Sequence, residues 1–177
     1  MSLSGTRVLI LAADLVEDIE LLYPLHRLRE EHAQVTVASL DGETATGKKG
    51  HPINVDASVD DVAADDFAGL IIPGGFAPDA FRRTDAVLDL VRAFDTAAKP
   101  LAFICHAGWV PISAGIIKGR RATSVATIKD DMINAGCHWE DSELVEDGHL
   151  ISSRDPRDLG PWMRAIITAL GGRVVEQ

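Results

Sequence analysis

Cys105 and His106 stand next to each other at a point in the sequence where covalent chemistry is common. They follow the apolar stretch Leu101–Ile104, which reads as a buried strand, and residues 106–114 read as a helix. A thiol at such a turn lies near the positive end of the helix dipole, which lowers its pKa and favours the nucleophilic thiolate. A buried, inert cysteine is the alternative, and the pair alone leaves both possibilities open.

Pro73-Gly74-Gly75 ends another apolar stretch, Gly69–Ile72. Glycines let the backbone turn and leave amide N–H groups uncovered, and such groups stabilise an oxyanion in acyl-transfer chemistry. A plain tight turn is the alternative. Spacing alone does not decide between them.

Glu17 begins a helical segment, residues 17–31, after a first strand over residues 7–13. An acid at this position can simply interact with the helix dipole. It could also place its carboxyl group against the sulfur of Cys105 and tune its reactivity. Ile19, Leu22, Leu25 and Leu28 recur along this helix and predict its buried face.

Strand and helix patterns alternate along the rest of the chain. Further strands are predicted over Gln34–Ser39 and Leu150–Ser153, with helices over residues 85–98, 129–135 and 158–170. Residues 41–50 read as a surface hairpin or loop, and Asp147-Gly148 as a two-residue hairpin turn. This alternation predicts a mostly parallel sheet covered on both faces, with ligands beyond the carboxyl ends of its strands.

The composition and length of the chain limit the classes of protein to which it can belong. The chain has 177 residues and a net charge of −10, which fits one domain over residues 1–177 and argues against nucleic-acid or anionic-membrane partners. The N-terminal apolar run is too short for a signal peptide or a membrane span, so we expect a cytoplasmic protein. Cys105 and Cys137 are then free thiols, with Cys137 packed in the core. Neither a zinc-ligand spacing nor a nucleotide-binding glycine motif occurs, so no cofactor or metal is expected.

Taken together, these segments resemble the PfpI family of the class I glutamine amidotransferase-like superfamily, which also holds the parkinsonism-associated deglycase. The matching segments run in the family's order over nearly the whole chain: Val16-Glu-Asp-Ile-Glu20, Tyr23-Pro-Leu-His-Arg-Leu28, Ile72-Pro-Gly-Gly75, Ala77-Pro-Asp79, Ile104-Cys-His106, Ser113-Ala-Gly115, Lys129-Asp-Asp-Met-Ile-Asn-Ala-Gly136 and Ser152-Ser-Arg154.

This resemblance implies a flavodoxin-like three-layer α/β sandwich and a strained turn at Cys105. It implies that Glu17 is hydrogen-bonded to the sulfur, that His106 is the base and that the backbone N–H groups of Gly75 and His106 hold the oxyanion. It also implies a homodimer or larger homo-oligomer, in which Asp79 of a neighbouring subunit orients His106. Asp79 stands where the family commonly has Glu, and Ala107 stands where it commonly has Gly.

Two functions follow as hypotheses. The first is a stress-response cysteine hydrolase that attacks a carbonyl carbon in a peptide, a glycated side chain or methylglyoxal. The second is a non-enzymatic oxidative-stress sensor or chaperone, because an exposed thiolate of low pKa is readily oxidised. The shorter Asp79 and the methyl group of Ala107 favour the second slightly.

Overall fold

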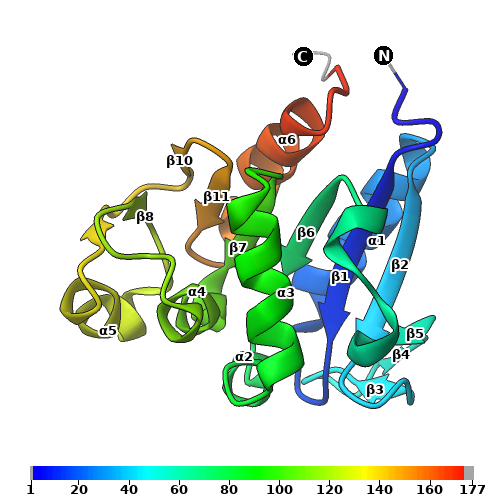
Figure 1. Cartoon of the computed structure of the whole chain (residues 1–177), viewed down its shortest axis with the longest axis horizontal. Helices are drawn as coiled ribbons and strands as arrows, with labels where there is room; N and C mark the ends of the chain where they lie inside the picture. The colour runs from blue at the N-terminus through cyan, green and yellow to red at the C-terminus, as the bar shows by residue number, and fades with distance from the viewer. Residues whose placement is uncertain (1, 174–177) are drawn as a thin grey trace.

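Seven strands form the central sheet of the computed structural model, which describes residues 2–173 (Figure 1). Their spatial order is β10-β11-β7-β6-β1-β2-β5, and every neighbouring pair is parallel except β10 with β11. The prediction of a mostly parallel sheet is therefore confirmed. The strands are β1 (Arg7–Ala12), β2 (Gln34–Ser39), β5 (Ala57–Ser58), β6 (Gly69–Ile72), β7 (Leu101–Ile104), β10 (Val145–Asp147) and β11 (Leu150–Ser153).

Helices cover the sheet on both faces. In Figure 1 α3 crosses in front of the strands, whereas α1 runs behind them and contacts α6. This arrangement is the flavodoxin-like three-layer sandwich that the sequence predicted. The α-helices are α1 (Asp18–Glu30), α2 (Ala77–Phe81), α3 (Asp85–Thr96), α4 (Trp109–Ala114), α5 (Lys129–Asn134) and α6 (Leu159–Ala169).

The central strands are apolar runs because both of their faces are covered. All residues of β6 and β7 are buried, as are all residues of β1 after Arg7. Helix α3 buries the face that the sequence predicted, including Val87 and Phe94. Helix α1 does so only in part: Leu25 and Leu28 are buried as predicted, but Ile19 is 48% exposed and Leu21 is buried.

Two short pairs of strands lie outside the large sheet. Strands β3 (Ala45–Thr46) and β4 (Pro52–Ile53) form a hairpin. Strand β3 lies within the predicted loop, residues 41–50, and β4 lies just after it. The second pair is β8 (Arg121–Ala122) with β9 (His138–Trp139). The hairpin turn at Asp147-Gly148 joins β10 to β11 as predicted, with Gly148 at φ 64°.

The carboxyl ends of β1 and β6 point to the same edge of the sheet, where α2 and the β3–β4 hairpin also lie (Figure 1). Strand β2, which follows β1 in the chain, pairs with one edge of β1, and β6 pairs with the other edge. Ligands of such sheets bind at this kind of topological switch point. Within residues 2–173 no helix is both long enough and apolar enough to cross a bilayer.

Candidate active site

Cys105 occupies a strained turn at the end of β7. It is the first residue of a 3₁₀ turn, Cys105–Gly108, and its φ is 62°, in the left-handed region that residues with a side chain seldom adopt. Its carbonyl accepts a hydrogen bond from the amide of Val125, at 3.3 Å. The turn therefore has the strained geometry that the family resemblance implied.

The Cys105 thiol is buried, with 9% of the residue exposed. Burial, and then the negative charge of Glu20, raise its pKa to about 12, although backbone N–H groups oppose both effects. The expected low pKa is therefore wrong. The turn is followed by a helix of only six residues, and its dipole does not offset the loss of solvation.

Glu20 is the carboxyl group beside the thiol. The residue has no exposed surface, its Oε2 accepts a hydrogen bond of 2.8 Å from the amide of Gly74, and the carboxyl also interacts with Cys105. Burial raises the pKa of Glu20 to about 7. Its Oε1 is buried without a hydrogen-bonding partner among residues 2–173, so this oxygen is free to carry a proton.

Glu17 does not reach the sulfur, so the predicted hydrogen bond from Glu17 to Cys105 is wrong. Its carboxylate pairs with Lys48 on the β3–β4 hairpin, with 3.3 Å between Oε2 and Nζ. Its backbone N–H instead supports the site by donating to the carbonyl of Gly74, at 3.1 Å. Glu17 precedes the first turn of α1 and Glu20 lies within it, and only Glu20 points into the protein.

His106 lies against Cys105. Its Nδ1 is 3.3 Å from Cys105 Sγ, and its Nε2 is 3.3 Å from the hydroxyl of Thr127. Burial, and then the charge of Lys48, lower the pKa of His106, so the imidazole is neutral near pH 7. A protonated thiol thus faces a neutral imidazole, and Nδ1 can accept the thiol proton.

The backbone N–H groups of Gly75 and His106 are directed at the Cys105 sulfur, where they lower the pKa of the thiol. Gly75 has φ 79°, and a Cβ there would collide with the backbone of Leu15 and Glu17. Glycine is therefore required where β6 meets the loop after β1. Both predicted oxyanion donors lie beside the nucleophile, and their role in a reaction stays a prediction.

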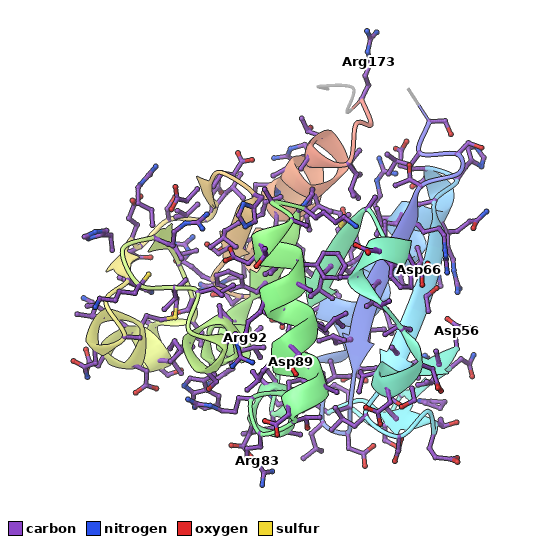
Figure 2. All side chains as sticks on the ribbon, viewed as in Figure 1. Asp56, Asp66, Arg83, Asp89, Arg92 and Arg173 are labelled. Carbon is purple, nitrogen blue, oxygen red and sulfur yellow. The ribbon has the colours of Figure 1, made fainter. Side chains whose placement is uncertain are left out.

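Asp79 lies on the surface of α2, with 61% of its side chain exposed, and pairs with Arg83 at 3.1 Å. Figure 2 shows Arg83 at the outer edge of the molecule beside α2. An approach of Asp79 to His106 of another subunit stays a prediction. Ala107 has no exposed surface and an ordinary negative φ, so its methyl group packs into the protein without backbone strain.

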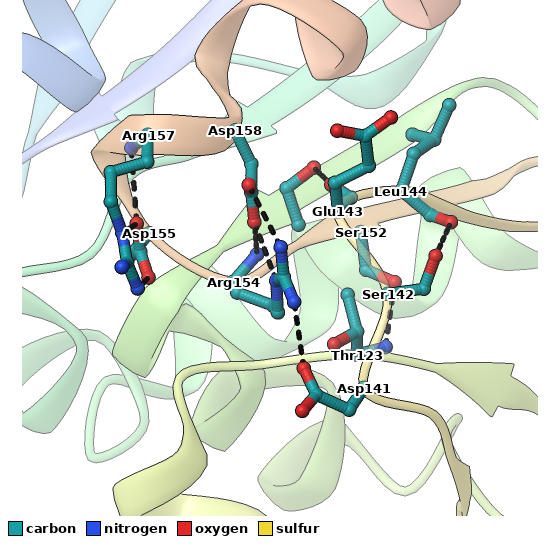
Figure 3. Close-up of polar contacts among 11 residues, drawn as sticks. Thr123, Asp141, Ser142, Glu143, Leu144, Ser152, Arg154, Asp155, Arg157 and Asp158 are labelled. Atoms are coloured by element: carbon teal, nitrogen blue, oxygen red, sulfur yellow. Dashed lines mark hydrogen bonds and ion pairs between the residues drawn. The ribbon is translucent and has the colours of Figure 1, made fainter.

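A network of ion pairs holds the loop after β11 (Figure 3). Arg154 binds Asp158 and Asp141, with shortest distances of 2.8 and 2.7 Å, and Arg157 binds Asp155 at 2.7 Å. The charge of Asp155 contributes to the raised pKa of Glu20. The sequence singled out Arg154 only as part of a matching segment, without a role.

Cys137 differs from Cys105 in its neighbours. Both are buried free thiols, and burial raises the pKa of Cys137 to about 11, but no histidine side chain forms a hydrogen bond with Cys137 among the described residues. Packing in the core agrees with the prediction. No group of three histidine, cysteine, aspartate or glutamate residues within residues 2–173 is arranged to hold a metal ion.

Comparison with known proteins agrees with this geometry. Residues 6–169 match the model of the DJ-1/PfpI family. The chain is 48% identical to a deglycase of Pyrococcus abyssi and 46% identical to Deglycase PfpI of Pyrococcus furiosus, each over 93% of this chain and 99% of the relative. The crystal structure of DJ-1beta from Drosophila melanogaster is 30% identical and superimposes with a TM-score of 0.90, covering 98% of this chain and 92% of the other. The chain therefore belongs to the DJ-1/PfpI family.

Proposed function

We propose that this protein is a cysteine-dependent hydrolase of the deglycase type, with Cys105 as its nucleophile. One observation carries the proposal: the Cys105 sulfur has an acceptor for its proton, His106 Nδ1, and two backbone donors, the amides of Gly75 and His106, around it. Nucleophilic attack on a carbonyl requires these two functions together. The name deglycase, which both archaeal relatives bear, favours glycated groups over peptide bonds as substrates.

The first chemical step uses only groups of this chain and its substrate. His106 Nδ1 takes the proton of the Cys105 thiol, and the sulfur electron pair forms a bond to the electron-poor carbon. The carbonyl π electrons move to oxygen, where the amides of Gly75 and His106 stabilise the negative charge. A protonated Glu20 lowers the cost of the transient thiolate, because the carboxyl then carries no repelling charge.

The sensor function has less support. An oxidant-sensing thiol is accessible and largely ionised near neutral pH, whereas Cys105 is buried and its pKa is raised to about 12. A thiol that must be deprotonated by a neighbouring base is better suited to catalysis, where the substrate arrives in contact with that base.

The test is a comparison of two conservative cysteine variants. Cys105→Ser should lower the turnover of the hemithioacetal of methylglyoxal by about 1,000-fold or more, because the weaker nucleophile replaces the sulfur at the reacting carbon. Cys137→Ser is the matched control and should keep most of the activity. Comparable activity in Cys105→Ser and the wild-type protein would contradict the proposal.

A further inference from the structure

The side chain of Lys48 contacts Glu17 and the ring of Phe76, although Lys48 belongs to the loop of a separate hairpin. The loop between β3 and β4 is bonded to the segment that leads into α1. The amide of Leu15 donates to the carbonyl of Thr46 at 2.7 Å, and the amide of Lys48 donates to the carbonyl of Val16 at 2.8 Å. The backbone of Lys48 is thus fixed to the same segment that carries Glu17 and Glu20.

Asp18 locks this loop further. It is buried, and its carboxylate accepts hydrogen bonds from the amides of Lys49, at 2.8 Å, and His51, at 3.3 Å. A Cβ on Gly47 would collide with the same carboxylate, so the loop can approach Asp18 only with glycine there. A charged carboxylate with two backbone donors gives strong, directional hydrogen bonds. These hydrogen bonds therefore fix the backbone of the loop that carries Lys48.

The ammonium group of Lys48 faces the site. It lies 3.3 Å from Glu17 Oε2 and 5.4 Å from the ring centroid of Phe76, the residue directly after Gly75. Its charge lowers the pKa of His106, second only to burial, which shows that its field reaches the catalytic imidazole. With 39% of the side chain exposed, the ammonium group remains accessible to a ligand.

A second cation, Arg82, reaches the surroundings of His106 through Trp109. Trp109 packs against the His106 ring, with 5.3 Å between ring centroids, and the Arg82 guanidinium lies 5.4 Å from the Trp109 ring. The ring of Phe76, which directly follows Gly75, and the ring of Trp109, which packs against His106, thus each have a cation nearby. In a chain with a net charge of −10, such a local arrangement of positive charge attracts anions that the rest of the surface repels.

The pairing of Lys48 with Glu17 does not prevent ligand binding. The side chain of Glu17 is 16% exposed and that of Lys48 is 39% exposed, so the free face of the pair is the ammonium group. An ammonium group has three donors, so Lys48 can bind a substrate carboxylate while it keeps its contact with Glu17. The bound carboxylate would also lie near the Phe76 ring.

We propose that Lys48 is a specificity residue, which selects substrates that carry a carboxylate close to the carbon attacked by Cys105. The inference rests on the proposed function and names its substrate class: adducts of 2-oxoaldehydes with free amino acids or with peptides that present a nearby carboxylate. The carboxylate would bind the Lys48 ammonium beside Phe76 while the reacting oxygen faces the amides of Gly75 and His106.

The decisive measurement does not depend on turnover. Iodoacetate and iodoacetamide alkylate a thiol by the same reaction and differ only in a carboxylate and an amide. Mass spectrometry of the Cys105 peptide gives the ratio of their rates. Lys48→Met should lower the iodoacetate-to-iodoacetamide ratio roughly five- to tenfold. Lys48→Arg should keep most of the ratio.

Lys49→Met is the matched control, because it removes the same charge from the next residue of the same loop. It should leave the ratio close to the wild-type value. An equal ratio in Lys48→Met and the wild-type protein, or an equal decrease in both Met variants, would overturn the inference.

Turnover measurements then distinguish the proposed carboxylate preference of Lys48 from the proposed deglycase activity. The hemithioacetals of methylglyoxal with N-acetylcysteine and with its amide form a matched substrate pair. The wild-type protein should prefer the carboxylate form in kcat/KM, and Lys48→Met should reduce this preference chiefly through KM. No turnover of either compound, together with the expected alkylation ratio, would reject the deglycase proposal and leave the anion preference standing.

Discussion

Cys105 and Glu20 form one buried acid pair, and the placement of their protons controls the chemistry of the site. A negative Glu20 raises the pKa of the thiol, and burial raises the pKa of both groups. Two negative charges in this small, poorly solvated space are strongly unfavourable. The pair therefore keeps at least one proton near neutral pH, and a thiolate forms most readily when Glu20 holds it.

The raised pKa of Glu20 makes protein stability depend on pH. The native state binds this proton more tightly than the unfolded state, so the carboxyl destabilises the fold progressively as pH rises from about 4.5 to about 7. Glu20→Gln removes that cost. We expect a gain in the free energy of unfolding close to zero at pH 4 to 5 and about 2 to 3 kcal/mol at pH 8. Urea denaturation at each pH measures it.

Glu17→Gln is the control for this prediction, since it makes the same change in the residue directly before α1. It removes an ion pair with Lys48 at the edge of the site and should change stability by less than about 1 kcal/mol at either pH. A gain of equal size in both variants, or one in Glu20→Gln that does not grow with pH, would contradict the buried-acid interpretation.

The mistaken choice of Glu17 has a physical cause. The spacing of Ile19, Leu22, Leu25 and Leu28 predicts a buried face that leaves Glu20 outside it. In the structure α1 buries Leu21 and Glu20 and exposes Ile19. Hydrophobic patterning assigns a carboxyl group to solvent, so it cannot find one that is buried for chemistry. The candidate nucleophile Cys105, by contrast, could be singled out from the sequence.

At the scale of elements, the site depends on the close approach of β6 and β7 at their carboxyl ends. Gly74 lies between them: a Cβ at this residue would be 2.7 Å from Cys105 Cβ, 2.7 Å from Glu20 Oε2 and 2.9 Å from the carbonyl oxygen of Ile104. Cys105 opens the strained turn and Ile104 is the last residue of β7 before it. The Glu20 carboxyl group accepts a hydrogen bond from the amide of Gly74.

Gly74→Ala should therefore displace the nucleophile. We expect a loss of about 1 to 3 kcal/mol in the free energy of unfolding, as for other overpacked sites, together with a large decrease in kcat. Gly160→Ala, in α6, is the control: its nearest neighbour would be the mobile end of Arg164, at 3.5 Å, and helix propensity favours alanine. Thermal unfolding and turnover of both variants provide the measurement. Full activity in Gly74→Ala would contradict the tight packing.

The order and type of the main elements could be predicted, because strands buried on both faces and amphipathic helices leave clear patterns in the sequence. The position of the β3–β4 hairpin could not. Its placement over α1 depends on hydrogen bonds from Lys49 and His51 to Asp18, which lie about 30 residues apart in the chain. Neither periodicity nor turn propensity carries information about such contacts.

At the scale of the whole molecule, the environment of His106 depends on which group contacts its Nε2 atom. Its Nε2 contacts Thr127, a hydroxyl that does not stabilise an imidazolium as a carboxylate does. Asp79 is exposed and pairs with Arg83, which lies in the turn after α2. An orienting carboxylate from another subunit would complete the His106 environment, and this requires a homo-oligomer.

Subunit complementation tests this arrangement directly. If the Asp79 of one subunit serves the His106 of another, Asp79→Ala and Cys105→Ser should each be nearly inactive alone. A mixture of the two, dissociated and reassembled, should form sites that combine an intact Cys105 with an intact Asp79. For random dimers about a quarter of the wild-type sites would be complete. Recovery of activity to that level would support a shared site, and sedimentation should show an oligomer. Full activity of Asp79→Ala alone, or a strictly monomeric protein that is active, would mean that His106 works with Thr127 alone.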